Sequence, residues 1–287
     1  MVGGGRWKLM KLVAAGLVVV VLAGCSHAQL GQAETAAAKL LVSDEQENQI
    51  GLQVKQQLEQ QQHVKYLDDP AVVAFVKRIT DKILPLAEKD RPGVKWQVHV
   101  IDDPKTVNAF AAPGGYLYVY SGLLLAADDA SQVAGVLSHE AGHVVARHSA
   151  RQMVDAMGLE AVTALALGQD PGAISQVVAG AGGKGLLLAN SRADETEADE
   201  YGARYASAAG YDPQGLIAFF DKLRKLEGQQ PGFAKFLSDH PATTDRIAHL
   251  RQFIAEHHLT GSAGHDPGDL TAVKARIPKG AGAPGSS

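Results

Sequence analysis

Apolar residues recur every three to four positions along much of the chain, which is the spacing of a helix with one buried face. The first such stretch runs from Ser43 to about Gln62, and Ser43 with Gln46 makes the capping-box pattern that starts helices. A second stretch begins at Asp69-Pro70 and is expected to end at Pro85, because proline interrupts the hydrogen-bond ladder of a helix. Further helices are expected over residues 129–145, 193–209 and 213–226, and a last one after Pro241.

A change to alternating apolar and polar residues between these helices predicts a small sheet. Residues 96–101 alternate in the way that suits a strand. Residues 107–111 and 116–120 flank Pro113-Gly114-Gly115, in which the glycines allow the positive φ angles of a tight turn. We therefore expect three strands, two of them joined as a hairpin, in a small antiparallel sheet.

The first 24 residues form a segment of their own. Arg6, Lys8 and Lys11 precede an apolar run over residues 12–23, which is the layout of a secretory signal peptide. The run is shorter than the roughly 20 apolar residues that cross a bilayer. A retained inner-membrane anchor is the alternative interpretation.

Cys25 follows this segment and is the only cysteine in the chain. The sequence Leu22-Ala23-Gly24-Cys25 resembles the lipobox of bacterial lipoproteins, whose cysteine becomes the lipidated first residue of the mature protein. An acylated Cys25 also explains a thiol with no disulfide partner in a chain expected in an oxidising compartment. Under the sorting rule that the resemblance implies, Ser26 at the next position favours the outer membrane.

The rest of the chain is expected to hold one folded domain between two loose ends. Of the 287 residues, 46% are hydrophobic and 20% are charged, which is ordinary for a globular protein. Removal of residues 1–24 takes away three positive charges and lowers the formal net charge from −4 to −7, so nucleic acid is not expected as a partner. We expect a tether over residues 25–42, a folded domain over residues 43–259 and a disordered tail over residues 260–287. The glycine-rich residues 168–185 fit a mobile loop or a weak helix equally well.

The segment His139-Glu140-Ala141-Gly142-His143 lies in one of the predicted helices and suits metal chemistry. Residues four apart lie on the same face of a helix, so the imidazoles of His139 and His143 can reach one metal ion. Glu140 lies about 100° around the helix from His139, which puts its carboxylate beside the metal, where it can act as a base on a water molecule. Without a metal, the two histidines would be unpartnered polar rings in an apolar helix.

A catalytic zinc site needs a third protein ligand, and an acidic run in the next predicted helix supplies the best candidates. Glu195 and Asp199 share one helix face at a spacing of four residues. We expect Glu195 to bind the metal and Asp199 to accept a hydrogen bond from a ligand imidazole, that of His139 in the first instance. Glu197 and Glu200 point elsewhere and are expected to be solvated, as charge runs usually are.

These features resemble peptidase family M48, a group of zinc metallopeptidases among the gluzincins. The resemblance implies a mainly helical α+β fold, one Zn²⁺ per chain and a substrate that binds as an extra strand at the edge of the sheet. The chain shows neither the multiple membrane spans of some branches nor a repeat domain, which favours the short lipoprotein or periplasmic branch. The resemblance spans roughly residues 45–255 and rests on His139-Glu140-x-x-His143, Glu195-x-x-x-Asp199, the hairpin at Gly114-Gly115, and His240-Pro241 with Arg246.

The function expected from this resemblance is hydrolysis of peptide bonds in unfolded or misassembled proteins of the cell envelope. Zinc would lower the pKa of a water molecule towards about 7, and Glu140 would take its proton and pass it to the leaving amine. His240 and Arg246 are candidates for stabilising the oxyanion. For His240 a second role is open, as a fourth zinc ligand that keeps the enzyme inactive.

Two other functions are open from the sequence. A non-catalytic envelope chaperone or assembly factor would keep the zinc for structure, with a closed set of four ligands. A different metal hydrolase, such as an amidase acting on cell-wall peptides, would use the same residues on another substrate. In each case we expect contact with the membrane through the lipid at Cys25, on the periplasmic side of the outer membrane.

Overall fold

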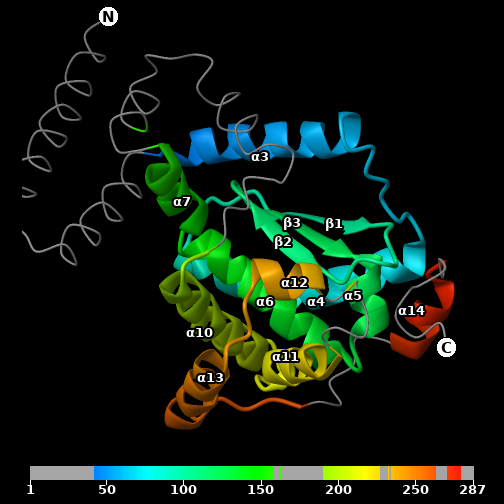
Figure 1. Ribbon diagram of the computed structural model, residues 1–287, viewed down its shortest axis with the longest axis vertical. Coiled ribbons are helices and arrows are strands. Elements are labelled where there is room, and N and C mark those ends of the chain that lie inside the picture. The colour runs from blue at the N-terminus through cyan, green and yellow to red at the C-terminus, as the bar shows by residue number, and fades with distance from the viewer. Residues whose placement is uncertain are drawn as a thin grey trace, which may run out of the picture.

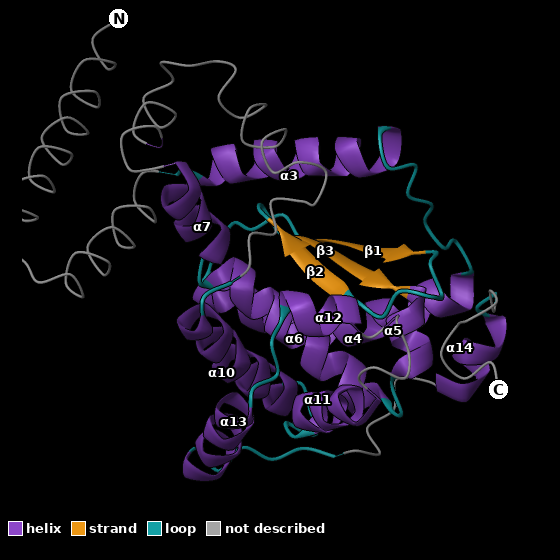
Figure 2. Cartoon of the chain, in the orientation of Figure 1, coloured by secondary structure: helices purple, strands orange, loops and turns teal. Residues whose placement is uncertain are grey.

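A computed structural model describes residues 42–157, 162, 190–226, 232, 234–262 and 270–278 of the chain. The predicted signal segment, Cys25, most of the predicted tether and the glycine-rich residues 168–185 lie outside the described residues. Figure 1 and Figure 2 show a small sheet with one long helix over one face and a group of helices under the other.

The sheet has three strands, β1 (Gln97–Ile101), β2 (Ala109–Ala112) and β3 (Tyr116–Tyr120), in the order β1-β3-β2. β2 and β3 form the expected antiparallel hairpin, with φ angles of 80° at Gly114 and 94° at Gly115. β1 pairs with β3 in parallel. The α+β fold class is therefore confirmed, but the sheet is mixed rather than antiparallel. The reason is that the chain places β2 on the far side of β3, so that β1 and β3 become neighbours that run in one direction.

Helices cover both faces of the sheet. α3 (Asp44–Gln60) lies over one face, where Phe110 and Tyr118 join its apolar side chains in one cluster. α4 (Pro70–Asp90) and α6 (Ala130–Val145) lie under the other face, where Val100 and Val119 join the main core. Every residue of α6 is buried. Its polar side chains must therefore find partners inside the protein.

α4 continues through Pro85, where the sequence predicts its end. The helix runs on to Asp90, and Ile83 and Ala87 on either side of the proline are fully buried. A proline inside a helix costs about 3 kcal/mol or more, whereas burying one isoleucine contributes about 1.5–3 kcal/mol. Packing on both sides of Pro85 thus offsets most of the loss, and the predicted helix end is wrong.

The second half of the described chain is helical. α10 (Arg192–Ala208), α11 (Gly215–Leu226) and α13 (Thr244–Glu256) confirm the helices expected at residues 193–209, at residues 213–226 and after Pro241. The pattern did not predict the short helices α5 (Ser121–Ala126), α7 (His148–Met157) and α12 (Ala234–Asp239). No helix within the described ranges is both long enough and apolar enough to cross a membrane. One more helix, α14 (Leu270–Arg276), follows α13 in the described chain.

α10 lies close against α6 because glycines stand where the two helices meet. A Cβ atom at Gly142 would lie 2.8 Å from the Cβ of Tyr201 and 3.0 Å from the carbonyl oxygen of Ala198. A Cβ atom at Gly202 would lie 3.2 Å from the backbone of His139. Residues without a Cβ permit this close approach. It brings the acidic side chains of α10 against the histidines of α6.

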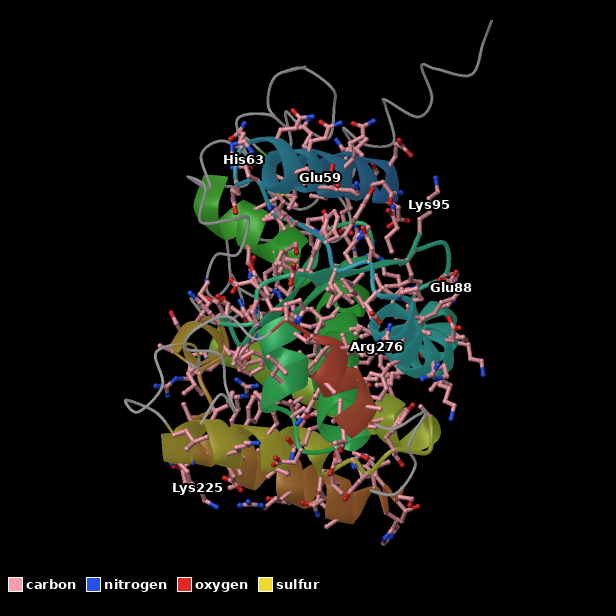
Figure 3. The ribbon with its side chains drawn as sticks, turned by 90° about the vertical axis from the view of Figure 1, so that its right-hand side faces the viewer. Glu59, His63, Glu88, Lys95, Lys225 and Arg276 are labelled. Carbon is pink, nitrogen blue, oxygen red and sulfur yellow. The ribbon has the colours of Figure 1, made fainter. Side chains whose placement is uncertain are left out.

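The predicted disordered tail contains an ordered helix, α14. Leu270, Val273 and Ile277 are buried in the main core. Arg276, labelled in Figure 3, donates hydrogen bonds to the carboxylate of Asp69 at the start of α4. Disorder over residues 260–287 is therefore a wrong prediction for this helix, because three apolar residues spaced three and four apart give it a face that packs on the body.

Candidate metal centre

Two helices and one loop bring the predicted ligands together. α6 carries His139 and His143, α10 carries Glu195, and His240 follows α12. Ligand atoms of these four buried side chains all lie within 4.8 Å of one another. The Nε2 atoms of His139 and His143 are 3.0 Å apart, and Oε1 of Glu195 lies 3.4 Å from Nε2 of His143. Two imidazoles and a carboxylate form a three-ligand set of the kind found in catalytic metal sites.

Asp199 lies behind His139, where the sequence predicts it. Its Oδ1 is 2.9 Å from Nδ1 of His139, which leaves Nε2 of that ring to face the other ligands. Arg246 donates to the same carboxylate, with Nε 2.6 Å from Oδ2 and Nη2 2.8 Å from Oδ1. Burial raises the pKa of Asp199, but the charge of Arg246 and the hydrogen bond from His139 outweigh it and hold the pKa below its ordinary value. Asp199 is thus an ionised acceptor that orients His139.

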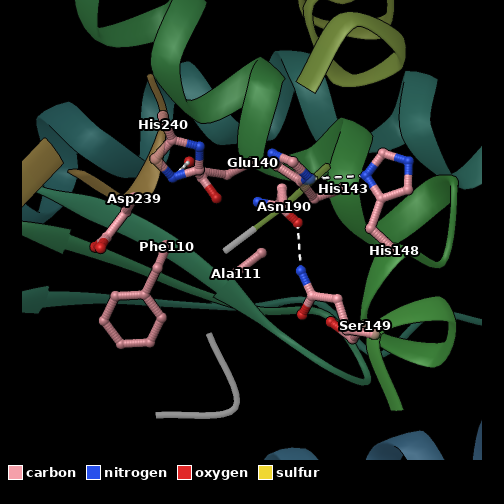
Figure 4. A pocket seen from close by; sticks show the side chains of 10 residues that line it. Phe110, Ala111, Glu140, His143, His148, Ser149, Asn190, Asp239 and His240 are labelled. Atoms are coloured by element: carbon pink, nitrogen blue, oxygen red, sulfur yellow. Dashed lines mark hydrogen bonds and ion pairs between the residues drawn. The ribbon is translucent and has the colours of Figure 1, made fainter. Parts of the chain in front are cut away.

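His143 has a different partner. Its Nδ1 lies 2.7 Å from Nδ1 of His148, the first residue of α7, as the dashed line in Figure 4 marks. Nε2 of His148 in turn lies 3.1 Å from Oε2 of Glu197. Both ligand histidines therefore engage Nδ1 within the protein and turn Nε2 toward each other.

This arrangement suits a cation between the two rings. If Nδ1 of His139 and of His143 each donates to its neighbour, both Nε2 atoms carry lone pairs. These lone pairs face each other across 3.0 Å, beside the Glu195 carboxylate. Burial holds the pKa of His143 well below its ordinary value, which keeps the ring neutral and able to bind a metal. The donor set thus fits one metal ion held by His139, His143 and Glu195.

Arg246 lies behind the ligands and not beside the cavity, where the predicted oxyanion donor would have to stand. Its Nη1 is 2.6 Å from Oε2 of Glu195 and also donates to the carbonyl of Pro241. Burial raises the pKa of Glu195, but the charge of His240 and the hydrogen bond from His143 hold it well below its usual value. With its nitrogens engaged in this way, Arg246 holds two buried carboxylates in place.

Glu140 lies beside the ligands and lines a small cavity (Figure 4). Its Oε1 is buried and lies 3.4 Å from Nε2 of His240, without a hydrogen bond of good geometry to any described residue. Burial raises the pKa of Glu140, against the charges of His240 and His139, so this carboxylate holds a proton more readily than an exposed glutamate does. The cavity measures about 30 Å³, which is room for about one water molecule.

His240 stands among the ligand atoms. Its Nδ1 is 3.2 Å from Nε2 of His139 and 3.1 Å from Oε1 of Glu195, and its Nε2 is 3.4 Å from Oε1 of Glu140. Burial lowers the pKa of His240, but the negative charges of Glu195 and Glu140 raise it to about 9. The structure therefore brings His240 to the metal centre, as the sequence predicts.

His148 has no predicted role in the sequence, and the charge run around Glu197 predicts a solvated side chain. The Glu197 side chain is 37% exposed, but it binds both His148 and Arg151. A continuous helix would put residue 148 about 140° around from His143. A turn at Arg147, with a φ of 60°, brings His148 back to His143 instead. Helical periodicity could not have shown this contact, and the only signal was a third histidine five residues after His143.

Comparison with known proteins agrees with this geometry. A model of peptidase family M48 matches residues 70–254 of the chain. The chain belongs to peptidase family M48. As a member of this family it is a metallopeptidase, and the buried cluster of histidine and glutamate is a site that could hold its metal.

Three relatives show how far the likeness extends. The chain is 34% identical over 184 residues to the mitochondrial metalloendopeptidase OMA1 of Schizosaccharomyces pombe, which covers 63% of this chain and 53% of OMA1. It is 33% identical over 253 residues to the metalloprotease LoiP of Escherichia coli, which covers 85% of this chain and 96% of LoiP. It is 29% identical over 195 residues to the beta-barrel assembly-enhancing protease of Escherichia coli, which covers 64% of this chain and 39% of that protease. The chain thus spans nearly all of LoiP but about half of OMA1.

Proposed function

We propose that this M48 chain is a zinc-dependent endopeptidase that hydrolyses unfolded or misassembled proteins of the cell envelope. The observation that carries the proposal is the position of Glu140. Its carboxylate and a cavity for one water molecule lie beside His139, His143 and Glu195. That ligand set is the one used by several zinc peptidases.

Zinc bound by His139, His143 and Glu195 would supply Lewis acidity to a water molecule and to the peptide carbonyl. Glu140 is placed to take the proton from the attacking water, because its carboxylate lines the cavity beside the ligands. Its raised pKa then favours holding that proton until the amine leaves. Transfer to the amine returns Glu140 to its ionised form, ready for another cycle.

The outer edge of β2 supports binding of substrate as an extended strand. Phe110 and Ala112 pair with β3, so the backbone groups of Ala109 and Ala111 point to the other edge. Ala111 lines the same cavity as Glu140 (Figure 4). A peptide paired with this edge would run past Glu140. Pairing through the backbone reads side chains loosely, which suits unfolded proteins as substrates.

The envelope setting is proposed from two observations. Cys25 stands in a lipobox-like sequence, and one relative is named a beta-barrel assembly-enhancing protease. We propose an acylated Cys25 that holds the chain on the periplasmic side of the outer membrane. Metabolic labelling with a fatty acid should mark the wild-type chain and leave Cys25→Ser unlabelled. Label on the variant would contradict acylation at Cys25 and favour the alternative, a membrane-spanning anchor.

The substrate class is tested by offering the purified mature chain two materials. We expect cleavage of a chemically denatured protein, slower cleavage of the same protein when folded, and no release of peptides from purified cell wall. Release from cell wall without cleavage of the denatured protein would instead support an amidase.

Replacing His240 by alanine is expected to raise proteolysis. Its Nδ1 faces His139 and Glu195, which favours a fourth-ligand position in the resting enzyme over an oxyanion donor. If nine-tenths of molecules rest in that state, its removal raises activity about tenfold. Turnover and zinc content are measured together, with the exposed His249→Ala as a matched control. A loss of about 10²- to 10³-fold in kcat would make His240 an oxyanion donor instead.

The position of His240 also favours the second candidate, a non-catalytic chaperone. Zinc held by four protein ligands is usually structural. A wild-type chain and a His240→Ala variant that both bind zinc and both leave denatured protein uncut would support the chaperone and contradict the peptidase.

A further inference from the structure

We propose that His148 is a positioning residue for the metal ligand His143, and that it links this ligand to Asp194 and Glu197 of α10. This inference rests on the proposed metal role of His143. Nothing in the mechanism above uses His148, although its side chain is only 1% exposed and lies within hydrogen-bond distance of a ligand.

The direction of the hydrogen bonds follows from the metal. A neutral His143 that binds a metal through Nε2 must carry its hydrogen on Nδ1, so it donates to Nδ1 of His148 across 2.7 Å. His148 then carries its own hydrogen on Nε2. That atom lies 3.1 Å from Oε2 of Glu197 and 3.6 Å from Oδ1 of Asp194. The result is a continuous relay from carboxylate to imidazole to ligand imidazole.

Each ligand histidine thus has a carboxylate behind it. One carboxylate contacts its histidine directly, and the others act through an intervening imidazole. Behind His139 stands Asp199 in direct contact. Behind His143 the carboxylates act through His148. Such partners fix the ring orientation of a ligand and raise its basicity, and losing one typically costs 10- to 100-fold in metal affinity.

An arginine holds the carboxylates in each case. Arg246 binds Asp199 on one side of the site. On the other side Arg151 of α7 binds Asp194 and lies 3.5 Å from Oε2 of Glu197. The parallel supports a matched function for the two sets of residues.

The backbone before His148 adopts an unfavourable conformation that delivers this side chain. Arg147 has a φ of 60°, a left-handed conformation that residues with a Cβ rarely adopt. Its guanidinium is held by the buried Glu47, with Nε 2.9 Å from Oε1, and by the carbonyl of Val42. The turn ends α6 and starts α7 at His148 without an intervening loop. Glu47 and Val42 thus stabilise a turn that aims the imidazole at His143.

The alternative is that His148 merely fills space. An apolar side chain would do so without the cost of burying two polar atoms. The variants His148→Phe and His148→Asn distinguish a positioning role from a space-filling role. Phenylalanine keeps an aromatic ring but removes both nitrogens, whereas asparagine puts an amide oxygen near the position of Nδ1 and can still accept the hydrogen bond.

The test measures zinc affinity by competition with a chelator, together with the absorption spectrum of the cobalt-substituted protein. We expect His148→Phe to bind zinc about 10- to 100-fold more weakly with an altered cobalt spectrum, and His148→Asn to recover most of the affinity. His249→Phe is the matched control, because His249 of α13 pairs at the surface with Glu200 of α10, and it should bind zinc as the wild type does. Glu197→Gln, at a partly exposed position, should lose less than about tenfold.

Several outcomes would overturn the proposal. His148→Phe with wild-type affinity and spectrum would show that packing alone accounts for His148. Equal losses in the phenylalanine and asparagine variants would show that the acceptor does not matter. If His148→Phe fails to fold, His148→Ala takes its place, because it also removes both ring nitrogens, and wild-type affinity and spectrum in that variant would reject the relay. Failure of the metal role of His143, on which this inference rests, is distinguishable, because His143→Ala would then keep its zinc.

Discussion

Glu140→Gln is expected to lower kcat on a denatured protein by about 10²- to 10⁴-fold, the usual contribution of a general base. Glutamine keeps the size of the side chain but cannot take a proton from water. Its zinc content should stay at one per chain, because the ligand cluster consists of His139, His143, Glu195 and His240 and does not include Glu140. Burying a neutral amide in place of a carboxylate with a raised pKa should also leave the fold intact.

Kinetics and metal analysis on the same preparations make this prediction specific. His143→Ala is the contrasting variant, since it should lose both zinc and activity. Activity within threefold of the wild type in Glu140→Gln would contradict the assigned base, and loss of zinc from that variant would mean that Glu140 is a ligand.

Arg246→Ala is expected to lower the free energy of unfolding of the metal-free protein by about 3–5 kcal/mol, the range seen when one partner of a buried ion pair is removed. The change leaves Asp199 and Glu195, both buried, without the cation that touches them. Zinc binding should weaken as well, because Asp199 would no longer be held against His139. Urea denaturation in the presence of a chelator measures the stability without the contribution of the metal.

Two further variants define what Arg246 does. Arg251→Ala removes an exposed arginine of the same helix, which pairs with Asp221, and should cost no more than about 1 kcal/mol. Arg246→Lys keeps the charge but not the planar fork that reaches both carboxylates, so it should recover only part of the stability. A loss of under about 1 kcal/mol in Arg246→Ala would show that the two carboxylates do not depend on this cation.

The elements that the sequence predicted well are those with a strong local signal. The capping box at Ser43, the hairpin at Gly114-Gly115 and the apolar stripe of α13 each depend on residues close together in the chain. The parallel pairing of β1 and the passage of α4 through Pro85 depend on which segments pack together, which no local pattern records. The same holds for α14, which is ordered because the body offers a surface to Leu270, Val273 and the following Ile277.

The residues of the site also differ in whether a local pattern could place them. His139, Glu140 and His143 lie on one helix, so their spacing alone predicted their arrangement. Glu195 and Asp199 required α10 to approach α6, and the glycines at the contact make this possible. His148 and Arg246 could not be placed from the sequence. The contact of His148 depends on a left-handed residue between two helices, and that of Arg246 on the packing of α13 behind α10.

Proteolysis by this chain is expected to depend on zinc held by His139, His143 and Glu195. The most direct measurement follows cleavage of a denatured protein by the purified mature chain after removal of the metal with a chelator and after stoichiometric zinc is returned. We predict that cleavage stops in the metal-free protein and is restored by one zinc ion per chain, but that zinc restores nothing in Glu195→Ala. Cleavage that persists in the metal-free chain, or that zinc restores equally in Glu195→Ala, would contradict this account.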